Sequence, residues 1–266
     1  MALPIPQAVS AALMCLVWVA PLVAQPAPMG PGMPDPGSNA TVSAECRAPA
    51  PRLYTRGVLP NVATALEQGR PIRVLALGSF PAGGLGGSPG APRYTTRLQT
   101  ELERVLRRAV VEVEGRRLPG ETTAGAPEAI MNAVMEVRPD LIVWGAGAHD
   151  ALARVEIEPF LKQVGEILDW MRSHDIDVVL VEPPYTAAIA DDQHYSALVG
   201  GLRAAAQRQN VPVVLRYDAM RYLSEQQAAS AEMQFRLHDL SRRCTPEYVA
   251  RAVGASLDTQ PGRTGN

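Results

Sequence analysis

Two histidine–aspartate pairs and one serine beside a glycine have the residue types that nucleophilic catalysis requires. His149 is followed directly by Asp150, and His238 is followed directly by Asp239. Ser79 stands at the start of a glycine-rich stretch. A serine nucleophile needs a histidine that takes its proton, a carboxylate that orients this histidine, and donors aimed at the developing oxyanion. These five residues are therefore the first candidates for a catalytic site.

The same histidine–aspartate pairs could instead be metal ligands, but their spacing argues against this interpretation. Side chains adjacent in sequence do not face the same way, and no third cluster with ligand spacing accompanies the pairs. His174 and His194 stand near the ends of expected helices, where a capping or solvated histidine is the ordinary explanation. We therefore expect neither a metal nor any other cofactor.

The charge balance and the glycine-rich loop exclude two further classes of function. The 25 basic and 27 acidic residues give a formal net charge of -2, so the chain lacks the basic excess that neutralises a nucleic-acid backbone. The loop GSFPAGGLGGSPG contains no GxGxxG in register and no GK[ST], so no nucleotide-phosphate cradle is indicated. We expect no nucleic-acid partner.

The N-terminus has the pattern of an export signal. The apolar, uncharged run within residues 1–24 is short for a bilayer span and ends in a small residue, which predicts a cleaved signal peptide. Because this segment carries no Lys or Arg, an uncleaved anchor is the alternative. Residues 25–45 are rich in Pro and Gly and are expected to be a disordered linker. The folded domain is expected over 46–257, followed by a disordered tail over 258–266.

Two cysteines remain if the signal is removed. Cys46 and Cys244 would then stand in a compartment where disulfides persist, and we expect them to pair. The alternative is two unpaired thiols. A bond between them would close a loop of nearly the whole domain.

Short apolar runs alternate with segments of helical period between these ends. Strands are expected at 72–77, 110–115, 141–147, 177–183 and 211–217, and helices at 94–109, 129–137, 160–171 and 195–206. This alternation predicts right-handed crossovers and a parallel five-stranded sheet covered by helices on both faces, a three-layer α/β fold.

In an open parallel sheet, ligands bind at the carboxyl ends of the strands. The predicted site therefore involves the loops that follow Leu77, Gly115, Trp144 and Tyr217.

Four stretches resemble the sequence blocks of the SGNH/GDSL hydrolases. The stretch from Leu75, LALGSFPAGGLGGSPGAPRYTTRLQTEL, is similar to the first block, including the tyrosine that opens the first helix. RRLPGE resembles the second block, PDLIVWGAGAHD the third and RLHDLSRRCTPEYVARAV the last. The resemblance covers roughly residues 70–255 in the family's order and implies its flavodoxin-like α/β/α fold.

The resemblance also implies roles for single residues. The histidine base falls on His238, and the glycine oxyanion donor falls on Gly120. The oxyanion asparagine falls on His149, whose ring nitrogen could still donate a hydrogen bond.

The remaining two catalytic positions of the family are occupied by phenylalanines. The nucleophile falls on Phe80, with Ser79 as its neighbour, and the aspartate that orients the histidine falls on Phe235. A phenyl ring cannot attack a carbonyl, and loss of a triad nucleophile costs about 10⁶-fold in kcat. Either Asp150 or Asp239 would have to replace the missing aspartate.

The sequence thus predicts an exported, periplasmic or secreted SGNH-like protein with lost or much reduced ester hydrolysis and a retained binding or scaffolding role. Its expected ligand is an acylated glycan or a small ester, and it meets a membrane only if the N-terminal segment stays uncleaved. The alternative is an active SGNH-type esterase that uses Ser79 and His238, supported by Gly120 and His149.

Overall fold

A computed structural model of the protein describes residues 42–78, 93–107, 109–118, 122–226 and 231–259. All of them belong to one compact unit. Within this described part of the chain, no helix combines the length and the apolarity that crossing a bilayer requires.

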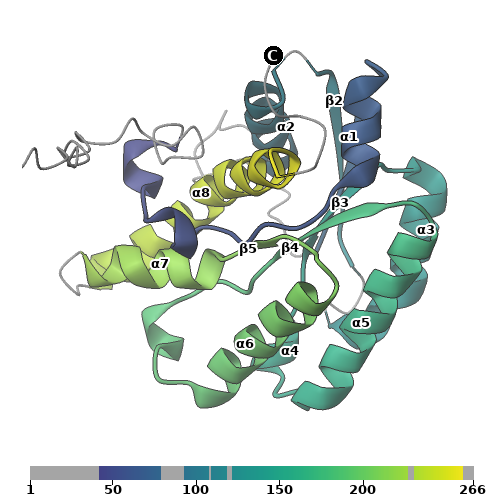
Figure 1. Ribbon diagram of the computed structural model, residues 1–266. Coiled ribbons are helices and arrows are strands. Elements are labelled where there is room, and N and C mark those ends of the chain that lie inside the picture. The colour runs from purple at the N-terminus through teal and green to yellow at the C-terminus, as the bar shows by residue number, and fades with distance from the viewer. Residues whose placement is uncertain (1–41, 79–92, 108, 119–121, 227–230, 260–266) are drawn as a thin grey trace, which may run out of the picture. The chain divides into compact units, whose positions relative to one another are not determined.

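The centre of the unit is a parallel sheet of five strands in the order β2-β1-β3-β4-β5 (Figure 1). The strands are β1 (Ile72–Leu77), β2 (Val111–Arg116), β3 (Leu141–Gly145), β4 (Asp177–Val181) and β5 (Val213–Val214). Every residue of β4 is buried, as expected for a strand covered by helices on both faces. The predicted three-layer α/β class and the five-stranded parallel sheet are confirmed.

Helices cover both faces of this sheet. On one face α2 packs against α8, and on the other α5 packs against α6 (Figure 1). The α-helices are α1 (Pro60–Glu67), α2 (Tyr94–Val105), α3 (Ala126–Val137), α4 (Ala148–Leu152), α5 (Ile157–Ser173), α6 (Gln193–Arg208), α7 (Arg216–Glu225) and α8 (Ala231–Leu257). Short 3₁₀ helices are η2 (Ala44–Cys46), η3 (Ala50–Arg52), η4 (Thr123–Gly125) and η5 (Ala187–Ile189).

The fifth strand is much shorter than the sequence predicts. The apolar run over 211–217 indicates a full strand, but β5 contains only Val213 and Val214. The backbone N–H of Leu215 bonds to the carbonyl of Leu53, 2.8 Å away, instead of continuing the sheet ladder. The predicted strand end at residue 217 is therefore wrong. The strand ends at residue 214, and residues 216 and 217 form the first turn of α7.

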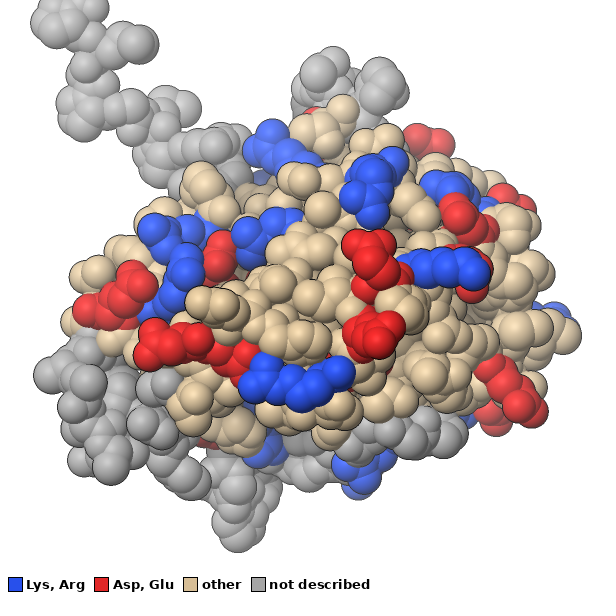
Figure 2. Space-filling view, turned by 90° about the horizontal axis from the view of Figure 1, so that it is seen from below, with Lys and Arg blue, Asp and Glu red and all other residues tan. Residues whose placement is uncertain are grey.

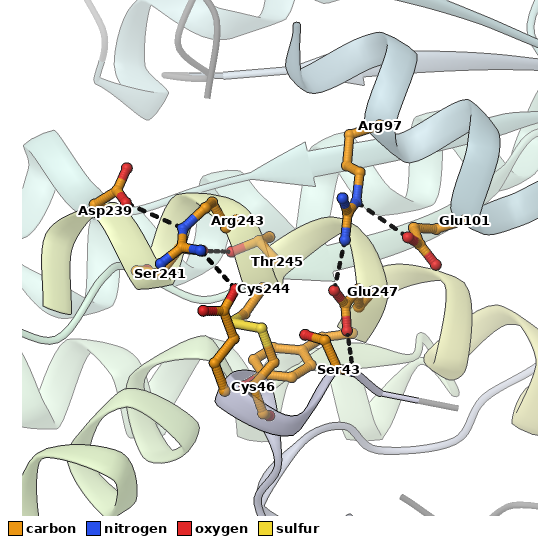
Figure 3. The surroundings of a disulfide bond; sticks show 12 residues. Ser43, Cys46, Arg97, Glu101, Asp239, Ser241, Arg243, Cys244, Thr245 and Glu247 are labelled. Carbon is orange, nitrogen blue, oxygen red and sulfur yellow. Dashed lines mark hydrogen bonds and ion pairs between the residues drawn. A yellow bond between two sulfur atoms is a disulfide. The ribbon is translucent and has the colours of Figure 1, made fainter. Parts of the chain in front are cut away.

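The segment before α1 is tied to the C-terminal helix by a disulfide (Figure 3). Cys46 and Cys244 are bonded across 198 residues of sequence, with their Cα atoms 5.4 Å apart, which confirms the expected pairing. The Tyr248 hydroxyl donates to the Cys46 carbonyl at 2.6 Å. Packing begins slightly before Cys46, since Val42 is already buried.

Candidate functional site

A small hollow lies where β1 and β3 end, at the carboxyl edge of the sheet. It is lined by side chains and backbone from the ends of both strands, from η4 and from α4, namely Gly78, Leu118, Thr122, Thr123, Trp144, Gly145, Ala146, Gly147, Ala148, His149 and Asp150. Trp144 is a buried wall of this hollow. The predicted location of the site, in the loops after β1 and β3, therefore coincides with a real depression in the described part of the protein.

Gly78 allows β1 and β3 to approach closely at this edge. Its φ is +118°, and a Cβ at this position would meet the Gly145 carbonyl oxygen at 2.5 Å. Only glycine combines that backbone conformation with so close a neighbour. Gly78, the residue that follows β1, therefore lines the hollow itself.

The third strand leads into α4, which carries His149 and Asp150. Gly147 begins the turn with a φ of +85°. His149 is half-buried and lines the hollow, and its oxyanion role stays a prediction. Asp150 is almost completely buried, and its carboxylate accepts bonds from the Thr123 backbone N–H at 2.9 Å and the Thr123 hydroxyl at 3.1 Å. This carboxylate fastens η4 to α4.

The second histidine pair lies on α8. His238 is exposed there. The carboxylate of Asp239 pairs with the Nε of Arg243 at 3.0 Å, and Arg243 in turn contacts Glu45 at 2.6 Å (Figure 3). Both carboxylates that stand beside the histidines in sequence are therefore engaged by other groups.

Several predicted site residues lie outside the described part of the chain. These are Ser79, Phe80 and Gly120, whose roles remain predictions. Phe235 falls in the first turns of α8, and its side chain is also outside the described part. Of the predicted set, the described structure places His149 in the hollow and His238 on the surface of α8.

A buried charged cluster that the sequence did not predict, centred on Glu182 and Arg203, lies directly after β4. Glu182 is fully buried and accepts two bonds from Arg203, at 2.6 and 2.9 Å. Its other oxygen accepts the backbone N–H of Tyr217 at 3.2 Å. Burial raises the pKa of Glu182 to about 7, against the lowering effect of Arg203. The motif VEPPY predicts only the end of a strand. The arginine that pairs with Glu182 lies 21 positions away in sequence, so the local motif does not indicate this ion pair.

Possible metal ligands are dispersed among the described residues, and charges of both signs share one face of the protein. Among the described residues, no group of three or more His, Cys, Asp or Glu side chains gathers as a metal site. Acidic and basic side chains are intermixed on the face that Figure 2 shows.

Residues 45–259 match the model of the Non-GDSL lipase-like family. No curated protein matches the sequence. The fold is similar to that of a lipase/acylhydrolase from Enterococcus faecalis, with 20% identity and a TM-score of 0.54 over 69% of this chain and 96% of that one.

Two further solved structures share the fold. An acetyl xylan esterase is 18% identical, with a TM-score of 0.54 over 68% of this chain and 100% of that chain. A two-domain esterase active on acetylated mannans is 14% identical, with a TM-score of 0.55 over 79% of this chain and 57% of that chain.

Proposed function

The chain belongs to the Non-GDSL lipase-like family, and we propose that it is an exported member with lost or much reduced ester hydrolysis and a retained binding or scaffolding role. The proposed ligand site is the carboxyl edge of the sheet, around the hollow that His149 lines. It needs no metal or other cofactor.

The engagement of both candidate carboxylates is the observation that carries this proposal. A catalytic histidine needs a carboxylate that holds its ring and stabilises its charged form. Asp150 is held by Thr123, and Asp239 by Arg243. Within the described part of the chain, no carboxylate forms a hydrogen bond or ion pair with His238.

The family resemblance supports the same conclusion from the sequence side. It aligns Phe80 with the nucleophile and Phe235 with the orienting aspartate. Neither phenyl ring can exchange a proton or form an acyl adduct. The attack on the ester therefore lacks its nucleophile, and the histidine lacks the carboxylate that orients it.

Export is supported by the disulfide between Cys46 and Cys244. Disulfides persist in oxidising compartments such as the periplasm or the cell exterior. The apolar run within residues 1–24 supplies the signal in this proposal, with an uncleaved anchor as the alternative.

The proposed ligand is an acylated glycan or a small ester. Two proteins that share the fold are an acetyl xylan esterase and an esterase active on acetylated mannans. Fold likeness does not transfer a substrate by itself, so the ligand class is an analogy that the binding experiments below must test.

A second candidate function is ester hydrolysis by Ser79 and His238, with Gly120 and His149 at the oxyanion. One observation favours it, since Gly78 and His149 line the same hollow and Ser79 directly follows Gly78.

An ester assay separates the two functions. The mature chain, residues 25–266, is incubated with p-nitrophenyl acetate beside Ser79→Ala, His238→Ala and the control His174→Ala. His174 is an exposed histidine at the C-terminus of α5 and does not line the hollow. We expect all four proteins to show the same background rate and no fluorophosphonate label. Turnover and labelling that Ser79→Ala and His238→Ala abolish, while His174→Ala retains them, would establish the esterase instead.

A further inference from the structure

Arg216 is a partly buried cation that forms no ion pair with any carboxylate among the described residues. It is the first residue of α7, and its Nε donates to the backbone carbonyl of Glu182 at 2.9 Å. Within the described part of the chain, no carboxylate forms an ion pair with Arg216, and no group accepts a hydrogen bond from its Nη1 or Nη2. The nearby carboxylate of Glu182 is paired with Arg203 instead.

The guanidinium lies among groups from three different elements. Its positive charge lowers the pKa of the hydroxyls of Tyr94, at the start of α2, and of Tyr195, in α6, although burial raises both values more strongly. The Tyr195 hydroxyl already donates to the Pro184 carbonyl at 2.7 Å. Arg216 therefore contacts the end of β4 at the carboxyl edge of the sheet, and its charge acts on the starts of α2 and α6.

An unpaired guanidinium in such surroundings is energetically unfavourable. Burial lowers the pKa of Arg216, and the negative charge of a bound anion would offset part of this desolvation. Arg216 as a residue is only partly buried, so part of its side chain is accessible from solvent. The bond from Nε fixes the plane of the group and leaves the two Nη atoms free to contact an anion side by side.

We propose that Arg216 anchors a carboxylate-binding site at the carboxyl edge of the sheet, which takes a ligand carrying a carboxylate group. The inference rests on the proposed binding function and specifies the chemistry of its ligand. A planar carboxylate matches the two-pronged guanidinium, which gives strong, oriented hydrogen bonds.

A singly charged carboxylate fits better than a doubly charged phosphate. One arginine neutralises a carboxylate, whereas a phosphate dianion would need a second cation. The neighbouring Arg203 is already occupied by Glu182 at 2.6 Å and by Asp218 at 3.1 Å. The described surroundings of Arg216 therefore offer one uncommitted positive charge.

The site is tested by titrating the mature, ¹⁵N-labelled chain with sodium galacturonate at constant ionic strength. The side-chain Nε–Hε signal of Arg216 is assigned by its loss in Arg216→Lys. We expect a saturable shift of this signal with galacturonate and none with galactose, the neutral counterpart. Arg216→Gln should weaken the affinity at least tenfold, measured from the backbone signals of α7.

Arg221→Gln is the matched control. Arg221 stands on the same helix, its side chain is 44% exposed, and it contacts Asp218 and Glu225. It should bind galacturonate as the wild type does. If Arg216→Gln fails to unfold cooperatively on heating, Arg216→Lys replaces it, because lysine retains the charge but loses the planar two-pronged contact.

Equal affinity for galactose, an unchanged affinity in Arg216→Gln or the absence of saturation would each overturn the inference. The ester assay reports independently of this titration. Ester turnover together with galacturonate binding would reject the loss of hydrolysis and leave the carboxylate site standing. No turnover and no binding would reject the carboxylate site alone.

Discussion

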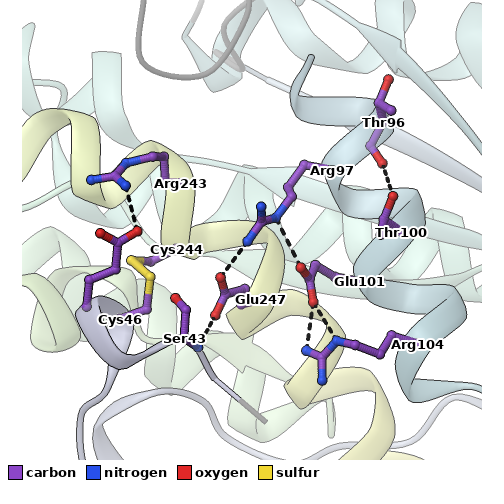
Figure 4. Close-up of polar contacts among 11 residues, drawn as sticks. Ser43, Cys46, Thr96, Arg97, Thr100, Glu101, Arg104, Arg243, Cys244 and Glu247 are labelled. Carbon is purple, nitrogen blue, oxygen red and sulfur yellow. Dashed lines mark hydrogen bonds and ion pairs between the residues drawn. A yellow bond between two sulfur atoms is a disulfide. The ribbon is translucent and has the colours of Figure 1, made fainter. Parts of the chain in front are cut away.

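The junction around the disulfide and the hollow at the carboxyl edge are built in opposite ways. We call the first region the disulfide junction, formed by Ser43–Cys46 with the facing parts of α2 and α8 (Figure 3). There Arg97 of α2 bridges Glu101 at 3.0 Å and Glu247 of α8 at 2.7 Å (Figure 4). The hollow, in contrast, is shaped by glycines and by the single Asp150–Thr123 contact.

The difference indicates a division of labour between the two regions. At the disulfide junction a covalent bond, buried carboxylates and an arginine all fix the same segments, so the loss of one contact leaves others in place. At the hollow the backbones of β1 and β3 approach closely at Gly78, and Asp150 joins α4 to η4 through Thr123. We therefore expect substitutions at the disulfide junction to change stability, and those around the hollow to change binding.

Removal of the disulfide should have the largest effect. In the chain-entropy model, a cross-link that closes a loop of this size contributes roughly 4–5 kcal/mol. The double variant Cys46→Ala/Cys244→Ala should lose stability of this order in urea unfolding and still bind galacturonate at low temperature. Dithiothreitol should lower the wild-type stability and leave the variant unchanged. Loss of binding in a variant that remains folded would contradict the division between the two regions.

Glu247→Gln should have the next largest effect. Glu247 is buried, and its two oxygens accept the Ser43 backbone N–H and the Arg97 guanidinium, both at 2.7 Å. Loss of one partner of a buried ion pair costs about 3 kcal/mol, although Glu101 still holds Arg97. Urea unfolding at pH 7 measures this loss.

Glu166→Gln is the control for that variant. Glu166 forms an exposed pair with Lys162 at 3.7 Å, and such pairs contribute about 0–1 kcal/mol. Equal losses in the two variants would mean that the buried network at the disulfide junction adds nothing beyond an ordinary surface contact.

The sequence predicted the regular part of the fold because that information is local. Buried runs such as Ile72–Leu77 and Leu141–Gly145 are continuous, and the spacing of apolar residues in α5 is helical. The fifth strand was predicted too long because its partners are distant in sequence. Leu53 satisfies the backbone of Leu215 from 162 positions away, and no local pattern reveals this bond.

The site could be located but not assembled from sequence. The family resemblance and the strand ends led to the hollow and to His149. They did not show that Asp150 would be taken up by Thr123, nor that Arg216 would begin a helix and form no ion pair among the described residues. Both facts depend on contacts between residues that are distant in sequence, which a local pattern does not determine.

A pH-dependent contribution to stability should arise at the amino ends of the strands, away from both regions. Asp177 accepts the Val62 backbone N–H at 2.8 Å and the Asn61 amide at 3.1 Å, which fixes the start of α1. Burial, with a smaller contribution from Asp140, raises its pKa to about 7. The folded state therefore holds a proton that the unfolded state releases near pH 4.

The contribution of Asp177 to stability should fall accordingly by roughly 2 kcal/mol as the pH rises from 5 to 7, and Glu182 should add a fall of the same sign in this range. Asp177→Asn should flatten this slope in thermal unfolding series, while Asp175→Asn, an exposed neighbour, should not. Galacturonate binding should be the same in both variants. A steeper slope in Asp177→Asn would show that the carboxyl is charged in the folded protein.

Thr123→Val should have the smallest effect on stability and tests the hollow itself. Valine matches the shape of threonine but removes the hydroxyl that donates to Asp150 at 3.1 Å, while the backbone N–H bond at 2.9 Å remains. The cost should be about 1 kcal/mol in urea unfolding, the usual value for one hydrogen bond. Thr64→Val, which removes an exposed hydroxyl contact to Pro60, is the control and should cost less.

The more informative readout of Thr123→Val is the ligand site, because Asp150 and His149 both stand on α4 and both line the hollow. Thr123→Val leaves the Asp150 carboxylate with one donor fewer, and its less compensated negative charge should disfavour an anion at the carboxyl edge of the sheet. We therefore expect weaker galacturonate binding in Thr123→Val at a stability close to that of the wild type, whereas Glu247→Gln should lose stability and keep its affinity. If the two variants lost affinity in proportion to stability, the hollow and the disulfide junction would form one cooperative unit rather than two regions with separate roles.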